Sequence, residues 1–246
     1  LLKDMTNDYP WQYVLILTSS LAVFGGSLIA LSIRYKGILK SNSKLEFTAF
    51  FKVFKDQQFR SAAFGYFGHM WELYTFWAFV PVMLKTYNVT HSSPNLNIPF
   101  WSFIIIGTGG LACVISGFIA QKKGAKNTAI VSLLLSGLCC LLSPFLFDTT
   151  SEGLFISFLI FWGMVVIADS PMLSTLVAQN TTPELKGTAL TIVNCIGFSI
   201  TIVSIQLIST VNEMTNSNNI YALLCIGPII GLFALRKKQK TETNVI

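Results

Sequence analysis

The chain has 246 residues, of which 52% are hydrophobic and only 11% are charged, and its formal net charge is +6. A water-soluble domain carries about 25% charged residues, so this composition excludes an ordinary soluble domain. The positive charge does not indicate nucleic-acid binding, because the chain contains no basic, aromatic-rich soluble module.

Seven apolar stretches in the sequence are long enough, or nearly long enough, to cross a membrane. A spanning helix needs roughly 20 mostly apolar residues, because the hydrocarbon core of a bilayer is about 30 Å thick. The stretches lack the strict alternation of a β-barrel, and helices satisfy their own backbone groups in lipid. The sequence therefore predicts an all-α, polytopic membrane bundle with spans at 11–33, 61–84, 98–120, 128–147, 153–178, 188–211 and a shorter 220–235.

The basic residues lie almost entirely in alternate loops between these spans. Fifteen Lys and Arg residues follow the first, third, fifth and seventh spans, and only Lys3 and Lys85 lie in the opposite loops. An excess of Lys and Arg marks cytoplasmic loops, so this asymmetry predicts an external N-terminus and a cytoplasmic C-terminus.

Residues 34–60 form the one long connection between spans. Its second half has the spacing of a helix that lies in the membrane interface, with four phenylalanines on one face (Phe47, Phe50, Phe51 and Phe54). We expect residues 1–33 to hold the last helix of an N-terminal half, 34–60 a cytoplasmic linker and 61–246 a six-helix bundle with a basic tail. One helix ahead of six further suggests that five helices precede Leu1 in the whole protein.

The five cysteines all fall inside spans, where small apolar side chains pack between helices. Their spacing indicates neither a disulfide framework nor a metal site. The sequence contains no HExxH or GxSxG motif, and only two histidines, His69 and His91. We therefore expect no cofactor, no metal and no enzymatic activity.

Three ionisable residues lie within the predicted spans: His69, Glu72 and Asp169. An acidic side chain at the centre of a spanning helix costs about 2.5–3.5 kcal/mol, so such residues usually have a role. His69 and Glu72 are three residues apart and share one helix face, which places the imidazole within reach of the carboxylate. Two interpretations remain open: a polar pair that orients helix packing, or a protonatable site that faces a water-filled cavity.

Asp169 has two interpretations as well. It precedes Ser170 and the helix-breaking Pro171, so its carboxylate could satisfy backbone groups that a kink frees, or it could belong to a proton pathway. Asn194 in the sixth span and Tyr66 in the second complete the candidate substrate or proton pathway.

The segment 117–126 resembles the loop motif G-x-x-x-D-R-x-G-R-R of the major facilitator superfamily. The matching positions are Gly117, Lys122, Gly124 and Lys126, while Gln121 replaces the acid and Ala125 the first basic residue. Segments 65–74 and 183–189 are similar to the seventh and eleventh helices of a bacterial branch loosely named nitrate/nitrite or cyanate permease-like.

This resemblance covers essentially the whole chain, as helices six to twelve. It implies a secondary transporter of a small molecule or ion in the bacterial inner (plasma) membrane, as a symporter or antiporter, with an N-terminal half as partner. In this family the seventh and tenth helices line the central cavity, and His69, Glu72 and Asp169 fall on those two helices. Because His69 lies one turn from Glu72 and could relay protons to a desolvated carboxylate, we expect protons to be the coupling ion. Anion porters of that branch are expected to hold their substrate with Arg or Lys, which spans 98–120 and 188–211 lack.

Seven spans with an external N-terminus also occur in two other classes of protein, seven-helix receptors or retinal proteins and integral-membrane enzymes. A retinal protein needs a lysine in its last span, which 220–235 lacks, and a seven-helix receptor usually carries a cysteine in an outer loop. An integral-membrane enzyme would be expected to cluster acids and histidines at the interface. The sequence supports neither alternative well.

Overall fold

The computed structural model describes residues 12–32, 49–91, 96–215 and 217–236, and every element formed by these residues is helical. The prediction of an all-α bundle is therefore confirmed. The chain divides into two compact units, Leu1–Leu45 and Glu46–Ile246.

The first unit contains one long helix, α2 (Gln12–Ser32), which is apolar and long enough to span a membrane. Two of its hydroxyl groups bond to its own backbone. Thr18 Oγ1 donates to the Val14 carbonyl at 2.9 Å, and Ser20 Oγ to the Ile16 carbonyl at 2.7 Å. Lipid offers a hydroxyl group no hydrogen-bond partner, and these bonds to the backbone supply one.

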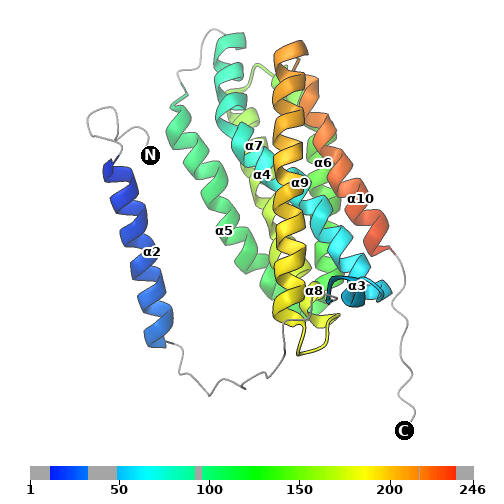
Figure 1. Cartoon of the computed structure of the whole chain (residues 1–246). Coiled ribbons are helices and arrows are strands. Elements are labelled where there is room, and N and C mark those ends of the chain that lie inside the picture. Colours follow the sequence, from blue (N-terminus) through cyan, green and yellow to red (C-terminus); the bar gives the residue numbers. More distant parts are fainter. Residues whose placement is uncertain (1–11, 33–48, 92–95, 216, 237–246) are drawn as a thin grey trace. The chain divides into compact units, whose positions relative to one another are not determined.

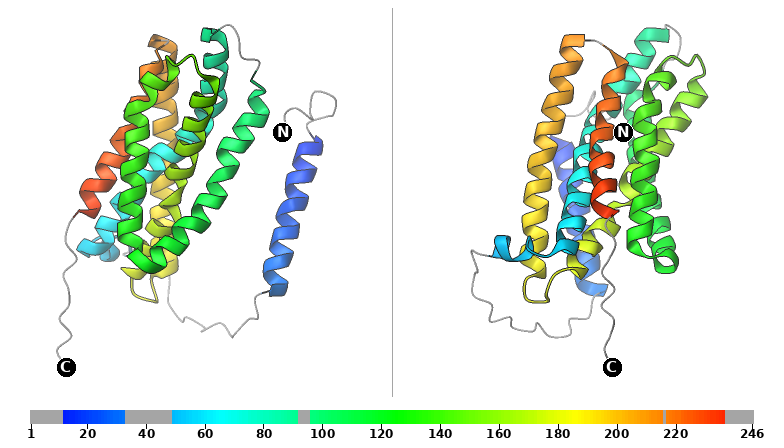
Figure 2. Two further views of the ribbon diagram at one scale, coloured as in Figure 1. Left: turned by 180° about the vertical axis from the view of Figure 1, so that it is seen from behind. Right: turned by 90° about the vertical axis from the view of Figure 1, so that its right-hand side faces the viewer.

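The second unit is a bundle of helices that run alternately in opposite directions (Figures 1 and 2). Helices α4, α6 and α9 run one way, while α5, α7 with α8, and η1 with α10 run back. Their bounds are α3 (Ala49–Val53), α4 (Gln57–His91), α5 (Ile98–Lys123), α6 (Ala125–Phe147), α7 (Glu152–Ala168), α8 (Ser170–Gln179), α9 (Lys186–Thr215), the 3₁₀ helix η1 (Asn218–Cys225) and α10 (Ile226–Leu235).

Among the described residues six helical stretches are long and apolar enough to cross a membrane, and they match six of the seven predicted spans. Helix α4 is the exception, although it has 35 residues. It contains Glu72, His69 and several Tyr, Trp and Gly residues, which lower its hydropathy. Eighteen of its residues are buried, because α10, α9, α8, α5 and α7 pack around it. A helix enclosed by other helices tolerates this polarity, since it shows little surface to lipid.

Two of the predicted spans are interrupted. The fifth is divided at Asp169 into α7 and α8, where Pro171 occupies the first turn of α8. Proline is tolerated there because the first turn needs no N–H donor for the helix ladder. The seventh begins as η1, capped by Ser217, and continues as α10.

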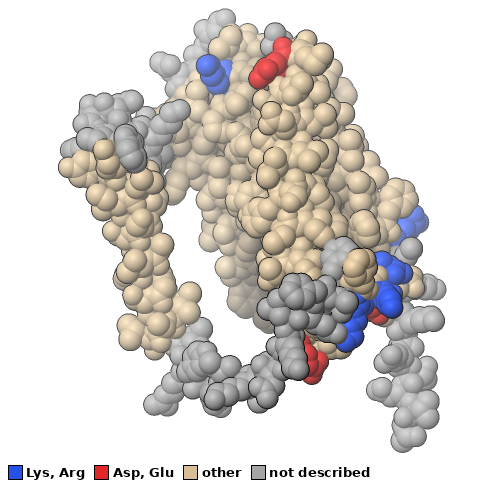
Figure 3. Space-filling model, in the orientation of Figure 1, with Lys and Arg blue, Asp and Glu red and all other residues tan. Residues whose placement is uncertain are grey.

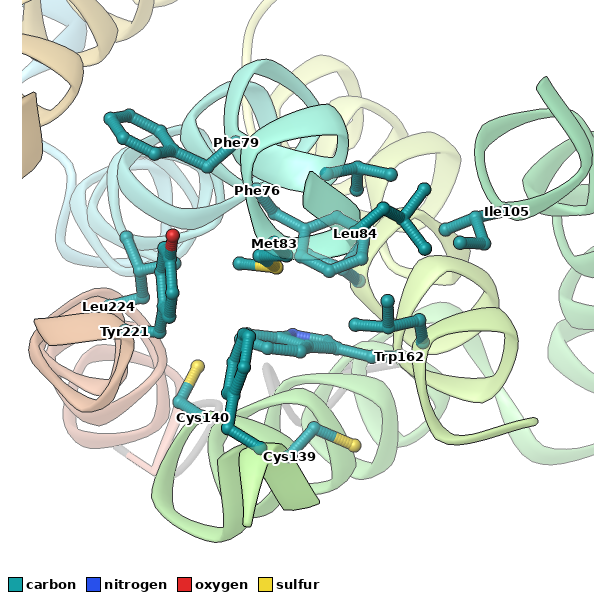
Figure 4. Packing of buried hydrophobic residues seen from close by; sticks show 14 of the residues in the cluster. Phe76, Phe79, Met83, Leu84, Ile105, Cys139, Cys140, Trp162, Tyr221 and Leu224 are labelled. Atoms are coloured by element: carbon teal, nitrogen blue, oxygen red, sulfur yellow. The ribbon is translucent and has the colours of Figure 1, made fainter. Parts of the chain in front are cut away.

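Buried apolar side chains form two clusters along α4. The first, which we call the upper cluster, runs from Leu73 to Tyr87 on α4 and includes Cys140, Trp162 and Tyr221 (Figure 4). The second, the lower cluster, includes Phe59, Tyr66 and Met70 of α4 with residues of α6, α8, α9 and α10. The residues of α4 between Met70 and Leu73 therefore lie where the two clusters meet.

Of the expected interfacial helix the structure describes the part from Ala49 onward, which forms α3 and ends at Val53. Phe51 is 68% exposed, while Phe54 packs edge-on against Phe59 at 5.1 Å. The helix ends because Asp56 caps α4, accepting the Phe59 N–H at 2.7 Å. This second part of the expected linker belongs to the bundle unit, whereas Phe47 lies outside the described residues.

Most described Lys and Arg side chains gather at one end of the bundle unit (Figure 3). They stand at the start of α4, at the α5–α6 turn, at the start of α9 and after α10, whereas Lys85 lies toward the other end. The loops that are rich in Lys and Arg in the sequence thus lie together at one end of the bundle unit.

Candidate functional site

Helix α4 carries His69 and Glu72 at the level where the upper and lower clusters meet. Both side chains are 1% exposed, and Asp169 is equally buried. These three are the only buried acidic or basic side chains among the described residues other than cysteine. The structure therefore places the three candidate ionisable residues in the interior of the bundle unit.

Glu72 accepts hydrogen bonds from side chains on two neighbouring helices. Trp162 Nε1 of α7 donates to Oε1 at 2.8 Å, and Cys140 Sγ of α6 donates to the same oxygen at 3.2 Å. Ser136 Oγ, one turn before Cys140 on α6, lies 2.9 Å from Oε2. One carboxylate thus joins α4, α6 and α7.

His69 contacts a different helix. Its Nδ1 lies 2.8 Å from Oδ1 of Asp169, at the break between α7 and α8. The distance is that of an ion pair, although the angles at this contact are not those of a hydrogen bond. The pair holds α4 against the point where the fifth span is interrupted.

Two sequence-based interpretations need correction. We expected His69 to pair with Glu72, but each has its own partners, because an α-helix projects the two side chains toward neighbours at different heights. We also considered Asp169 as a cap for the freed backbone. Asp169 occupies the cap position of α8, yet its side chain makes no cap hydrogen bond and instead contacts His69.

Glu72 was also interpreted as facing a water-filled cavity. The structure encloses its carboxylate between α6 and α7, with Trp162 packed tightly against Phe76 at a ring separation of 4.6 Å. Figure 4 shows Trp162 among the apolar side chains of the upper cluster. In this conformation the carboxylate lies in packed protein.

Of the two remaining pathway candidates, one lies beside the buried ionisable residues and the other does not. Tyr66 is buried one turn before His69, with ring centroids 6.0 Å apart. Asn194 is exposed on α9, and no contact joins it to the three ionisable residues. The structure therefore brings Tyr66, but not Asn194, to the buried group.

The loop-motif residues lie at the basic end of the bundle. Helix α5 ends at Lys123 and α6 begins at Ala125, so Gly124 alone makes the turn, with φ of +84° and its N–H bonded to the Ala120 carbonyl at 2.8 Å. That positive φ favours glycine, because a side chain there would be strained. Gln121 and Lys122 are exposed, while Gly117 and Lys126 are partly buried.

The sequence analysis missed the three donors to Glu72. Ser136 and Trp162 carry no charge and gave no signal, and Cys140 was interpreted only as a packing residue. Ser136 and Cys140 are four residues apart and share one face of α6, which a pattern search could have noted. Their partner on another helix could not have been found without the tertiary structure.

Carboxyl and imidazole groups can each bind and release a proton. Glu72 has three hydrogen-bonding neighbours, whereas His69 and Asp169 are joined by the contact between Nδ1 and Oδ1. The described part of the chain brings no three His, Cys, Asp or Glu side chains together as metal ligands.

A sequence model of the family described as Major Facilitator Superfamily matches residues 5–205, which includes α2 and all helices through most of α9. A search of curated proteins found no match.

Proposed function

This chain belongs to the major facilitator superfamily of membrane transporters, and from that premise we propose that it moves a small solute by alternating access, driven by protons. The proposed location is the bacterial inner membrane, with the basic end of the bundle and the C-terminus in the cytoplasm. That orientation rests on the gathering of Lys and Arg at one end.

The observation that carries the proposal is the environment of Glu72. Its carboxyl group is 1% exposed at membrane depth and is surrounded by neutral donors. The nine described Lys and Arg side chains lie near the ends of the helices, too distant to neutralise it. Because an ionised acid in the membrane interior is costly, proton uptake is the simplest way for Glu72 to become neutral.

His69 and Asp169 provide a second protonatable group one turn from Glu72 along α4. In the proposed cycle this pair relays protons between Glu72 and the basic end of the bundle. Tyr66, beside His69, extends the same line of polar side chains toward that end.

The charge of the solute can be inferred only indirectly from the buried residues. An anion would need a cationic anchor, and the described spans offer no buried Lys or Arg. The nitrate-like branch suggested by the sequence therefore gains no support from this part of the chain. A neutral or cationic solute fits the buried group better, in symport or antiport with protons.

Replacing Glu72 by Gln in the whole transporter tests the coupling. The solute is first identified by a thermal-shift screen of small anions, cations and neutral compounds, and uptake is then measured in proteoliposomes. Glu72→Gln is expected to abolish uptake driven by a proton gradient while solute exchange without a gradient continues. Glu152→Gln, at an exposed acid in the first turn of α7, is the matched control.

If gradient-driven uptake survives in Glu72→Gln with an unchanged pH profile, Glu72 only joins α4, α6 and α7. The proposal of proton coupling through this residue is then wrong.

A further inference from the structure

The hydroxyl group of Ser136 lies between two acceptors. Its Oγ is 2.9 Å from Oε2 of Glu72 and 3.2 Å from the carbonyl oxygen of Leu133, one turn back on the same helix. Ser136 is 1% exposed, so bulk solvent does not reach either contact. A serine hydroxyl has one hydrogen to donate and can accept as well, so it can satisfy only one of these acceptors at a time.

The two possible directions of this hydroxyl match the two protonation states of Glu72. When Glu72 is ionised, Ser136 donates to Oε2. When a proton binds Oε2, the new O–H group donates to Ser136 Oγ, and the serine hydrogen turns to the Leu133 carbonyl. Every polar atom of the pair therefore keeps a partner in both states, which matters because an unpaired buried polar group is costly.

The other carboxyl oxygen keeps its partners throughout. Trp162 Nε1 can only donate, and with Cys140 Sγ it occupies Oε1. Oε2 has Ser136 as its only hydrogen-bond partner among the described residues. The geometry thus identifies Oε2 as the atom that takes up the proton.

We propose that Ser136 is a positioning residue whose rotating hydroxyl lets Glu72 bind and release a proton without leaving a buried atom unpaired. This inference rests on the proposed function, in which Glu72 carries the coupling proton. The step forms one O–H bond at Oε2, with the proton delivered from water through the His69–Asp169 pair. As that bond forms, the N–H bond of protonated His69 breaks, and His69 regains its proton from hydronium, which becomes water.

Other titratable groups also face Glu72, and none duplicates this geometry. They are His69 on α4, Asp169 at the α7–α8 break, Cys139 and Cys140 on α6 and Cys225 of η1. Of these only Cys140 makes a hydrogen bond to the carboxylate, and it shares Oε1 with Trp162. Among the described residues, α9 and α10 present no ionisable side chain to this group.

Infrared difference spectroscopy of the purified whole transporter tests the inference with protons as the only ligand. Spectra are recorded across a pH change in H₂O and D₂O, and the carboxylic-acid C=O band of Glu72 is assigned by its loss in Glu72→Gln. The frequency of this band rises when the acid loses a hydrogen bond. Ser136→Ala is therefore expected to shift the band to higher wavenumber, and Ser136→Thr, which keeps the hydroxyl, to leave it in place.

Ser143→Ala is the matched control. Ser143 is also buried on α6 and donates to the Cys140 carbonyl at 2.8 Å, but no contact joins it to Glu72, so its loss should leave the band unmoved. If Ser136→Ala does not fold, Ser136→Cys replaces it, and its weaker acceptor should give a smaller shift in the same direction. A purely structural serine would not change the frequency of this band.

The outcomes separate the two proposals. A Glu72 band that is present in the wild type and unmoved in both Ser136→Ala and Ser136→Cys overturns the role of Ser136 alone. If no Glu72 band forms at any pH at which the protein is folded, Glu72 never binds a proton, and the proposed coupling and the role of Ser136 both fail.

Discussion

The side chains around Glu72 and His69 make different contacts because they differ in how many hydrogen bonds they can donate and accept. Trp162 can only donate, so its 2.8 Å bond holds Glu72 Oε1 in either protonation state. Ser136 can reverse its direction, and His69 contacts a separate carboxylate at the helix break. The three contacts attach α4 to its neighbours at two successive levels.

Replacing Trp162 by Phe removes the donor and keeps most of the ring volume. A hydrogen bond contributes about 0.5–1.5 kcal/mol, and about 1.5–3 kcal/mol when its acceptor is ionised, so the midpoint of thermal unfolding in detergent should fall. Trp77→Phe is the control, because Trp77 Nε1 is buried without a hydrogen-bond partner among the described residues. Equal losses in the two variants would mean that the indole N–H bond to Glu72 contributes nothing specific.

The contact between His69 and Asp169 can be isolated by a double-mutant cycle with His69→Gln and Asp169→Asn. Residues in direct contact show interaction energies of about 0.5–3 kcal/mol, so the double variant should lose less stability than the two single losses added together. Thermal unfolding of the four proteins provides the measurement. Additive losses would show that the 2.8 Å contact carries no coupling.

At the scale of elements, close backbone contact between α4 and α10 positions the helix that carries the buried group. A Cβ atom added at Gly68 would overlap the carbonyl oxygen of Gly227 and lie 2.9 Å from the Gly231 nitrogen. Gly68 immediately precedes His69, so this contact sets the depth and rotation of α4 near the site. The same interface is closed at the basic end, where Ser61 Oγ donates to the Ala234 carbonyl at 2.6 Å.

Substituting Gly68 by Ala should therefore separate α4 from α10 and destabilise the bundle by about 1–3 kcal/mol, the usual cost of overpacking. Gly107→Ala on α5 is the matched control, since nothing lies within 4 Å of a Cβ atom there. Its helix should be unaffected or slightly stabilised, because alanine favours helix more than glycine does. Thermal unfolding in detergent distinguishes the two, and a neutral Gly68→Ala would contradict the tight contact.

At the scale of the whole molecule, the Lys and Arg residues at one end of the bundle predict its orientation in the membrane. Such charges set orientation during insertion, because basic loops are retained on the cytoplasmic side. At the α5–α6 turn Gln121 stands where the family motif has an acid. The main effect of the lysines there should then be on topology.

Replacing Lys122, Lys123 and Lys126 together by Gln should reduce correctly oriented protein in the membrane more than it changes the KM of the whole transporter. Orientation is measured by labelling a cysteine introduced at Lys85 with an impermeant maleimide, in a Cys195→Ser background because Cys195 is exposed. A large change in KM with normal orientation and expression would instead indicate that these lysines act in the transport cycle.

Much of the fold followed from the sequence alone. Apolar length located every span within the described residues to within a few residues at most ends, because the thickness of a bilayer imposes that length on any helix that crosses it. The position of the loop motif and the family resemblance were likewise local features, and the match over residues 5–205 bears out the superfamily.

The sequence also located the three ionisable residues but paired them incorrectly. His69 and Glu72 share a helix face, and helical spacing alone predicted that their side chains contact each other. It could not show that α6 and α7 supply Ser136, Cys140 and Trp162 to Glu72, or that the α7–α8 break supplies Asp169 to His69. The phenylalanine spacing predicted a helix where α3 lies but not its end at Val53, before the Asp56 cap of α4 and the packing of Phe54 on Phe59.

The sequence by itself thus determined which segments enter the membrane, which end of the bundle is basic and which residues carry charge into its interior. Those properties depend on composition and on distances along the chain. Only the tertiary structure decided which helices surround Glu72 and how close α4 comes to α10. Those properties depend on contacts between residues as far apart as Glu72 and Trp162, whose meeting is set by the packing of whole helices and not by any local pattern.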